Sequence, residues 1–318
     1  GDNPFTRKAR LLQSFFREIT IKEKEFGRGP NKNSVHILKD ENGHPTGETI
    51  PSFYGNMLVK GDESNKNFFY LETYHYAVKR VREKTKDETI DDYRLFNNML
   101  SSMPMAFNLF HPLMMIKEKY PDALNKMIQD AFPSLPVHSV EEIKIEFIPV
   151  PIDEYTNDKS AMDAAIFFKD IKGNCYLIAI ETKYTDSLGT NKAKDNALKF
   201  CTAKELNQFT DDGINFIETG CPQIYRNYLL AEKYGQVHNF KDTYSIILAP
   251  KDHPTTTTEI NLLRTKLKPQ FHYKIEKNDL ESFIEKLKIN CPQEFCEWLN
   301  NFYTRYLDFA LAENLLKQ

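Results

Sequence analysis

Two neighbouring apolar runs constrain the fold of this chain more than any other feature of its 318 residues. One covers 162–168 (Met-Asp-Ala-Ala-Ile-Phe-Phe) and the other covers 176–183 (Tyr-Leu-Ile-Ala-Ile-Glu-Thr-Lys). Strands that are apolar on both faces lie inside a sheet that is covered on both sides. A short polar segment, Asp170-Ile171-Lys172-Gly173-Asn174, separates the two runs. The pattern therefore predicts a pair of central strands joined by a tight hairpin.

The hairpin also predicts which side chains face each other. A three-residue loop commonly forms a type I turn followed by a left-handed residue, and Gly173 stands where that residue would be. In this register residue 170 pairs with 174, and Asp163 falls opposite Glu181. Lys183 lies two residues beyond Glu181 and shares its face because strand side chains alternate. A slip of one residue in the turn would separate the three groups.

Two carboxylates in this position repel each other, and that repulsion must be offset by a proton or a cation. Facing side chains lie roughly 5 Å apart at Cβ, where two negative charges repel by about 3 kcal/mol at an effective dielectric near 20. Either one carboxyl is protonated or a cation lies between them. One lysine does not neutralise two carboxylates, whereas a divalent ion does, and hard oxygen ligands favour Mg²⁺. The alternative is that Asp163 caps the turn into its strand while Glu181 and Lys183 form an ordinary ion pair at the rim.

The remaining pattern predicts mainly helices before residue 136 and alternating strands and helices after it. Expected helices in the first part cover 4–19, 68–85, 90–120 with an interruption near Pro104, and 123–132, and the loop-rich region 27–61 holds at most one short strand, 57–59. In the second part the expected strands are 142–150, 164–169, 175–184, 243–248 and 271–275, and the expected helices are 222–234, 256–267, 279–289 and 293–316.

Composition is that of an ordinary globular protein, with 41% hydrophobic and 27% charged residues and a net charge of −3. No apolar run approaches the roughly 20 residues that cross a bilayer, so we expect no membrane association. Five cysteines without a CxxC pair suggest reduced thiols and a cytoplasmic protein. Three segments, 78–86, 191–204 and 262–277, are rich in Lys and Arg. Each is either a solvated face or part of a nucleic-acid contact.

The residues now support a resemblance. Asp163, followed on the adjacent strand by Glu181-Thr182-Lys183, resembles the Asp…Glu-x-Lys signature of PD-(D/E)XK nucleases. The order of helix, three strands, helix and strand is similar to the common core of that superfamily. Segments 105–110 and 180–185 also resemble a little-studied bacterial branch described as restriction endonucleases. Met162 departs from the pattern, because many relatives have proline there.

The resemblance implies a fold and a division of the chain. The expected fold is α/β, with a restriction-endonuclease-like core in which helices flank a mixed sheet, and with helical N- and C-terminal additions. Residues 1–92 would form the N-terminal extension, 93–277 the nuclease core, and 278–318 C-terminal helices packed on that core. We expect one structural unit.

The resemblance also implies an activity. Asp163 and Glu181 would bind Mg²⁺ together with the backbone carbonyl of Thr182, and Mn²⁺ would also support activity. Lys183 would orient or deprotonate the attacking water and stabilise charge on the phosphate. The implied reaction is hydrolysis of phosphodiester bonds in nucleic acid, with DNA as the expected partner and an endonuclease of restriction type as the expected enzyme. Relatives are often homodimers, because cutting both strands needs two sites.

Five further residues are candidates for the site. Glu146 lies on the preceding strand, with a solvated strand glutamate as the alternative reading. Gln223 and Arg226 lie three residues apart on one helix face, where relatives hold the phosphate or the water; an ordinary surface pair is the alternative. Ser102 and Asn108 belong to the helix before the sheet. Asn108 has apolar neighbours, so it is alternatively a hydrogen-bonded core residue.

Three other functions stay open at this point. A non-catalytic nucleic-acid-binding module could retain the same fold. An assembly protein could use the charged cluster only as an ion pair. A hydrolase could act on a small phosphoester rather than a polymer. Motifs of other enzyme classes, such as a glycine-rich phosphate loop, HExxH or GxSxG, do not occur in the sequence.

Overall fold

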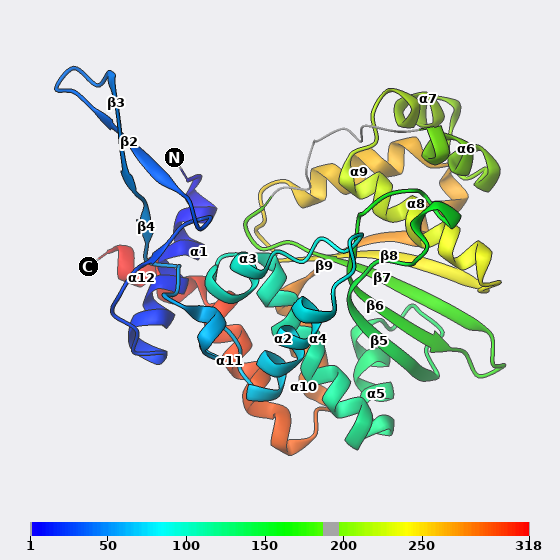
Figure 1. Ribbon diagram of the computed structural model, residues 1–318. Coiled ribbons are helices and arrows are strands. Elements are labelled where there is room, and N and C mark those ends of the chain that lie inside the picture. The colour runs from blue at the N-terminus through cyan, green and yellow to red at the C-terminus, as the bar shows by residue number, and fades with distance from the viewer. Residues whose placement is uncertain (1, 187–196, 318) are drawn as a thin grey trace.

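The computed structural model describes residues 2–186 and 197–317, which form an α/β structure in which helices cover a central sheet (Figure 1). The α-helices of these residues are α1 (Pro4–Phe15), α2 (Leu71–Glu83), α3 (Asp92–Asn97), α4 (Ser102–Lys119), α5 (Pro121–Ala131), α6 (Ala197–Leu206), α7 (Asp211–Thr219), α8 (Gln223–Val237), α9 (Thr256–Lys266), α10 (Leu280–Ile289), α11 (Cys296–Tyr306) and α12 (Phe309–Leu316).

The central sheet has the strand order β5-β6-β7-β8-β9. Its strands are β5 (Ser139–Phe147), β6 (Met162–Lys169), β7 (Cys175–Thr182), β8 (Asp242–Ala249) and β9 (Ile275–Asp279). The first three form an antiparallel meander, and β7, β8 and β9 run parallel to one another. Helix α8 makes the crossover from β7 to β8. The mixed sheet between helices confirms the expected α/β class.

The hairpin that joins β6 and β7 has the predicted register. Lys169 pairs with Cys175 and Ala164 pairs with Ile180, so the next facing pair is Asp163 and Glu181. Gly173 has a φ of +82°, and its N–H donates to the carbonyl of Asp170 at 3.0 Å. The conformation is left-handed, which explains the glycine. The turn therefore fixes the two acidic residues on neighbouring strands.

Each face of the sheet has its own cover. Ala164, Ile166 and Phe168 of β6 pack in one large core with helices α4, α5, α10 and α11, whereas Met162 packs on the opposite face. Odd-numbered residues, such as Ala165 and Phe167, pack against Leu230 and Ala231 of α8. Because both faces are covered, the central strands are apolar throughout. Glu181, near the end of β7, faces α8, where its carboxylate accepts a hydrogen bond from Gln223.

The two ends of the chain meet beside this core (Figure 1). Helix α1 packs against α11 and α12. Arg305 of α11 is fully buried; its Nε donates to Gln13 at 3.1 Å and its Nη1 donates to the carbonyl of Asn67 at 2.9 Å. Gln13 in turn donates to the hydroxyl of Tyr184 at 3.2 Å, one residue after Lys183. The terminal segments therefore contact the strand end that carries the candidate site.

The loop-rich region 27–61 differs from the expectation. It contains a protruding hairpin of β2 (Val35–Lys39) and β3 (Pro45–Pro51), and a small pair of β1 (Gly27–Arg28) with β4 (Phe53–Tyr54) (Figure 1). The expected strand 57–59 is wrong, since Met57 forms only an isolated bridge with Asn98. The hairpin is mostly exposed on both faces, so its sequence has no apolar alternation that would reveal it.

A second difference concerns the expected strand 271–275. Residues Pro269–Lys274 form a 3-10 helix, and the strand β9 begins only at Ile275. Lys274 is buried there and reaches Glu232 of α8 at 2.9 Å. The alternation of aromatic residues thus reflects a turn packed against the sheet edge. Helices α6 and α7 were also not predicted from the sequence.

Candidate active site

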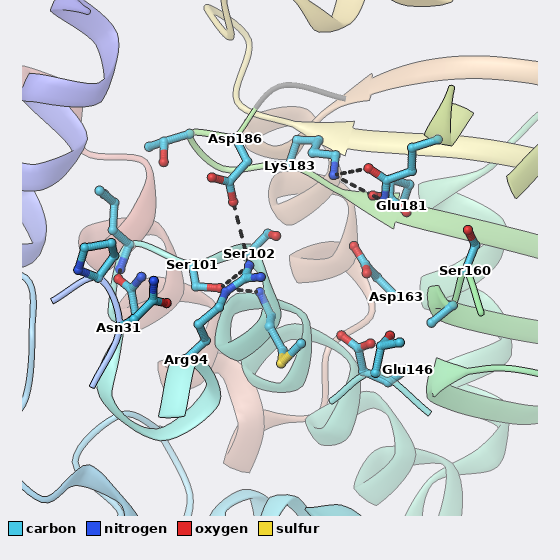
Figure 2. A pocket seen from close by; sticks show the side chains of 18 of the residues that line it. Asn31, Arg94, Ser101, Ser102, Glu146, Ser160, Asp163, Glu181, Lys183 and Asp186 are labelled. Atoms are coloured by element: carbon cyan, nitrogen blue, oxygen red, sulfur yellow. Dashed lines mark hydrogen bonds and ion pairs between the residues drawn. The ribbon is translucent and has the colours of Figure 1, made fainter. Parts of the chain in front are cut away.

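A cleft of about 1440 Å³ opens beside the ends of β5, β6 and β7 (Figure 2). Glu146, Asp163, Glu181 and Lys183 form one wall. The opposite wall comes from the start of α4 and the helix before it, and residues near α1 and β4 also line the cleft. The structure thus brings the three predicted signature residues together at an accessible surface.

The acidic residues of this wall come from three adjacent strands. Ile145 pairs with Ala164 and Phe147 with Met162, so Glu146 faces Asp163. Asp163 in turn faces Glu181 in the register of β6 and β7. Three carboxyl groups therefore follow one another across the sheet. Their proximity makes the charge of each one depend on the others.

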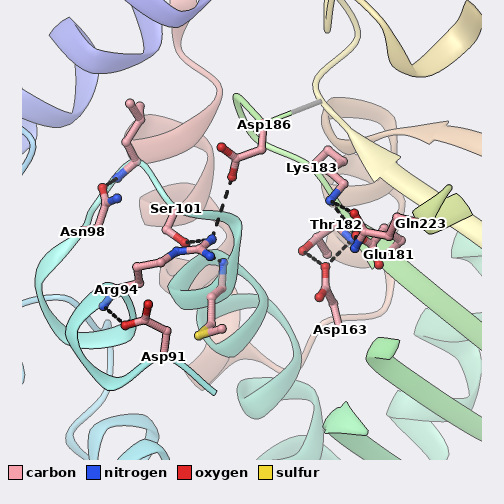
Figure 3. A network of polar contacts seen from close by, with 12 residues as sticks. Asp91, Arg94, Asn98, Ser101, Asp163, Glu181, Thr182, Lys183, Asp186 and Gln223 are labelled. Carbon is pink, nitrogen blue, oxygen red and sulfur yellow. Dashed lines mark hydrogen bonds and ion pairs between the residues drawn. The ribbon is translucent and has the colours of Figure 1, made fainter. Parts of the chain in front are cut away.

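Asp163 is held by its neighbour strand. Its Oδ2 accepts hydrogen bonds from the backbone N–H of Thr182 at 2.7 Å and from the Thr182 hydroxyl at 2.8 Å (Figure 3). Within the described residues no hydrogen bond reaches Oδ1. Burial raises the pKa of Asp163, although the charge of Lys183 and the bonds from Thr182 oppose the rise. One oxygen is thus held by Thr182, and the other is available to a ligand in the cleft that Asp163 lines.

Glu181 is fully engaged by hydrogen bonds. Its Oε1 accepts from Lys183 Nζ at 2.6 Å and from Gln223 Nε2 at 2.8 Å, and its Oε2 accepts from Asn227 Nδ2 at 2.6 Å. Burial and the charge of Asp163 raise the pKa of Glu181 to about 7, against the effect of Lys183. These hydrogen bonds hold the Glu181 carboxylate in one orientation, but the single charge of Lys183 does not neutralise both Glu181 and Asp163.

Lys183 supplies the positive charge of this wall. Its side chain is only 7% exposed and pairs with Glu181. Burial lowers the pKa of the Lys183 ammonium, but the charges of Glu181 and Asp163 outweigh burial and raise it overall. Lys183 therefore stays protonated beside the carboxylates. In this state the Lys183 ammonium can donate hydrogen bonds but cannot accept a proton.

Glu146 has a strained backbone and a buried carboxyl. Its φ of +50° is left-handed, which is uncommon for a residue other than glycine and costs on the order of 1 kcal/mol or more. Its side chain lines the cleft while the residue is only 5% exposed. Burial, with the charges of Asp163 and Glu181, raises its pKa well above the usual value. The alternative of a solvated strand glutamate does not describe this residue.

Helix α8 contributes polar groups, and both predicted residues, Gln223 and Arg226, line the cleft. Gln223 contacts Glu181, as does Asn227 one turn later. Arg226 also lines the cleft, but its Nη1 lies 3.5 Å from Asp158. The sequence paired residues 223 and 226; the spacing of four that places Asn227 on the same face was the missed signal.

The two candidates on α4 have different environments in the structure. Ser102 lines the cleft. Asn108 does not: it is buried, donates to Asn67 O at 2.8 Å and Tyr306 Oη at 3.0 Å, and accepts from Phe69 N at 3.1 Å. It is therefore the hydrogen-bonded core residue that the alternative reading described.

The cations that line the cleft are mostly not those of the basic segments. Arg10, Arg94, Lys159 and Arg226 come from four separated parts of the chain. From segment 191–204, Lys199 lines the cleft and pairs with Asp158 at 3.0 Å, whereas 191–196 lie outside the described residues. Segments 78–86 and 262–277 do not line it. Scattered cations leave no local sequence pattern.

Comparison with known proteins agrees with this geometry. A family model described as the PD-(D/E)XK nuclease superfamily matches residues 1–308. The chain belongs to the PD-(D/E)XK nuclease superfamily. No curated protein and no solved structure matches it. Membership of the PD-(D/E)XK superfamily implies a nuclease that acts on nucleic acid. None of the described helices has the length and apolar character that a bilayer span requires.

PD-(D/E)XK nucleases generally depend on a divalent metal, and the donor set here fits one. The cleft wall holds three carboxyls and one lysine, and burial leaves the acidic groups with raised pKa values. Over 2–186 and 197–317, no three His, Cys, Asp or Glu side chains converge as a ready-made metal cluster. A divalent ion at this wall would therefore be held by one or two carboxylates, with waters or substrate oxygens as its other ligands.

Proposed function

We propose that this chain is a Mg²⁺-dependent endonuclease of restriction type that hydrolyses phosphodiester bonds in DNA, with a restriction-endonuclease-like core. The observation that supports the proposal is the placement of Asp163, Glu181 and Lys183 on one wall of an open cleft. Belonging to a nuclease superfamily makes phosphodiester hydrolysis the natural use of that wall.

Each residue has a role that its contacts support. Asp163 through Oδ1, Glu181 through one carboxylate oxygen, and the backbone carbonyl of Thr182 would hold the ion. When bound, Mg²⁺ lowers the pKa of a water and neutralises charge on the phosphate. Glu181 must exchange a hydrogen bond from Lys183, Gln223 or Asn227 for that contact. The displaced donors then become available to the substrate.

Lys183 would act on the phosphate directly. Because its pKa is raised, its ammonium stays protonated and can stabilise negative charge that develops on the phosphoryl oxygens. Gln223, whose Oε1 lies 3.3 Å from Lys183 Nζ, would hold the ammonium in place or orient the water. Both functions need only groups that already line the cleft.

The size of the cleft favours a polymer over a small phosphoester. Pockets for small ligands usually measure about 300–1,000 Å³, whereas this cleft measures about 1440 Å³ and is lined by several cations. Cations spread along an open surface suit a charged backbone. The proposal includes DNA as the polymer and a homodimer that cuts both strands.

Metal binding and cleavage test the proposal together. Titration calorimetry would measure Mg²⁺ and Mn²⁺ binding to the protein and to Asp163→Ala, with the exposed Asp153→Asn as a matched control outside the cleft. We expect Asp163→Ala to lose binding and to lose cleavage of plasmid DNA by about a hundredfold or more, while Asp153→Asn keeps both.

The rival functions predict different results. A non-catalytic DNA-binding module would bind DNA without cutting it in either ion. An assembly protein would do neither, and a small-phosphoester hydrolase would act on nucleotides but not on polymers. Equal and weak ion binding by the protein and by Asp163→Ala would remove the support for catalysis.

A further inference from the structure

The wall of the cleft opposite the carboxylates is the start of helix α4. This helix of 18 residues begins at Ser102, with Ser101 as its N-cap. The Ser101 hydroxyl accepts from the N–H of Met103 at 3.3 Å, and all three residues line the cleft. The start of a helix carries unpaired N–H groups and a positive partial charge, which favour an anion.

Ser102 provides a second, independent observation. The residue is only 8% exposed and lines the cleft, so its side chain is enclosed at that surface. Among the residues that the structure describes, its hydroxyl has no hydrogen-bond partner. The hydroxyl is not one of the fully buried polar atoms that lack a partner, so it is open to the cleft that Ser102 lines. The Ser102 hydroxyl, in the first turn of α4, is therefore free to donate a hydrogen bond to a ligand.

Arg94 adds a charge to the same place. It lies on α3, and its Nη2 donates to Ser101 Oγ at 3.2 Å (Figure 3). Its guanidinium pairs with the Asp186 carboxylate at 4.0 Å, and the Arg94 and Asp186 side chains are 38% and 54% exposed. A surface pair at that distance is weak. Most of the five N–H donors of the guanidinium therefore remain available to a ligand.

The two walls face each other across one cleft. Figure 2 shows Arg94, Ser101 and Ser102 on one side, with Asp163, Glu181 and Lys183 on the other. A strand bound at the carboxylate wall would therefore pass beside the α4 wall.

We propose that Arg94, Ser101 and Ser102, with the N–H groups that begin α4, bind a backbone phosphate next to the one that is cut. The inference rests on the proposed function and assigns these residues to substrate binding. A phosphodiester suits the site because a guanidinium and a helix N-terminus both bind phosphate oxygens. None of these residues belongs to the Asp…Glu-x-Lys signature.

The salt dependence of DNA binding tests this site without cleavage. A fluorescent duplex is titrated in EDTA at several salt concentrations, and the logarithm of the binding constant is plotted against the logarithm of salt. Each neutralised phosphate contributes about 0.9 to the slope. We expect Arg94→Gln to weaken binding about tenfold at physiological salt and to reduce the slope by about one.

Ser102→Ala distinguishes a hydrogen bond from a charge. It should weaken binding about three- to fivefold while leaving the salt slope unchanged, because the hydroxyl donates but carries no charge. Both variants keep the Ser101 cap, so thermal unfolding should change little. Arg82→Gln, an exposed α2 arginine outside this cleft, is the matched control and should keep affinity and slope.

The possible outcomes separate the two proposals. If the protein binds DNA and Arg94→Gln binds with the same affinity and slope, the α4 site is wrong while the proposed nuclease stands. If Ser102→Ala also lowers the slope, the hydrogen-bond assignment is wrong. If the protein binds no duplex at any salt concentration, the proposed DNA substrate and this site fall together.

Discussion

A single oxygen of Asp163 accepts both the backbone N–H and the hydroxyl of Thr182 on the neighbouring strand. This pair of bonds ties β6 to β7 at the strand ends, where the ladder of facing residues stops. It also leaves the second oxygen of Asp163, a residue that lines the cleft, without a hydrogen bond from the described residues. The same contact thus closes the sheet and orients a candidate metal ligand.

Asp163→Asn should stabilise the protein in the absence of metal. The amide oxygen can accept both bonds from Thr182. Burial and the charge of Asp163 together raise the pKa of Glu181 to about 7, and the variant removes that charge. We expect a gain of about 1–2 kcal/mol at pH 8. Because the folded pKa of Asp163 is raised, its unfavourable contribution exists above the unfolded pKa and vanishes below about 4.

Urea unfolding of this variant in EDTA at pH 8 and pH 4 measures the effect. The gain should be present at the higher pH and small at the lower one, and cleavage should be lost. Lower stability of Asp163→Asn at pH 8 would mean that the Asp163 carboxylate stabilises the fold instead of destabilising it by repulsion.

Lys183→Met should destabilise the metal-free protein at pH 8 by about 3 kcal/mol, because it leaves Glu181 and Asp163 buried without their nearest cation. The ion pair requires an ionised Glu181, whose pKa is about 7. Its contribution is therefore present above that pH and declines as the pH falls through it. Unfolding in urea at pH 8 and 5.5 should show a smaller deficit at pH 5.5.

Lys172→Met, on the exposed hairpin loop, is the matched control for loss of a lysine. It should leave stability unchanged at both values of pH. A deficit for Lys183→Met that is equal at pH 8 and 5.5 would contradict the assigned ion pair.

Arg305→Met should destabilise the protein by about 3 kcal/mol, since it removes bonds to Gln13 and Asn67 and leaves their buried polar groups unpaired. Arg305→Lys should recover little of the lost stability, because the lysine ammonium cannot reproduce the several hydrogen bonds that the planar guanidinium donates in fixed directions. Limited proteolysis should show earlier cleavage within residues 1–92. Cleavage at an unchanged rate would show that these contacts do not hold the N-terminal segment.

Gly173→Val should cost about 1–2 kcal/mol, whereas Gly173→Asn should cost less. The reason is the φ of +82°, which β-branched residues disfavour and asparagine tolerates; no neighbour within 4 Å would obstruct either side chain. Thermal unfolding of both variants measures the difference. Equal losses would show that the turn adopts another conformation in solution.

The signature region could be predicted from the sequence because its determinants are local. Two apolar runs and a glycine in a short loop fix the register, and the register fixes that Asp163 faces Glu181. Strand alternation then brings Lys183 to the same face. Each step depends on residues fewer than about twenty positions apart.

Other features required the tertiary structure because they depend on distant segments. The hydrogen bond from Asn227 to Glu181 exists only because α8 packs on β7. Arg94 and Ser101 reach the cleft from outside the sheet, and the exposed hairpin β2–β3 has no core to impose a pattern on its sequence.

The sequence by itself therefore determined the class of fold and the three residues of the signature, since hydrophobic period and turn geometry act over short separations. Only the tertiary structure decided that the carboxyls are buried enough to have raised pKa values, and that a second wall with a helix N-terminus and an arginine faces them. Burial and electrostatic fields are sums over the whole fold, so no local stretch of sequence encodes them.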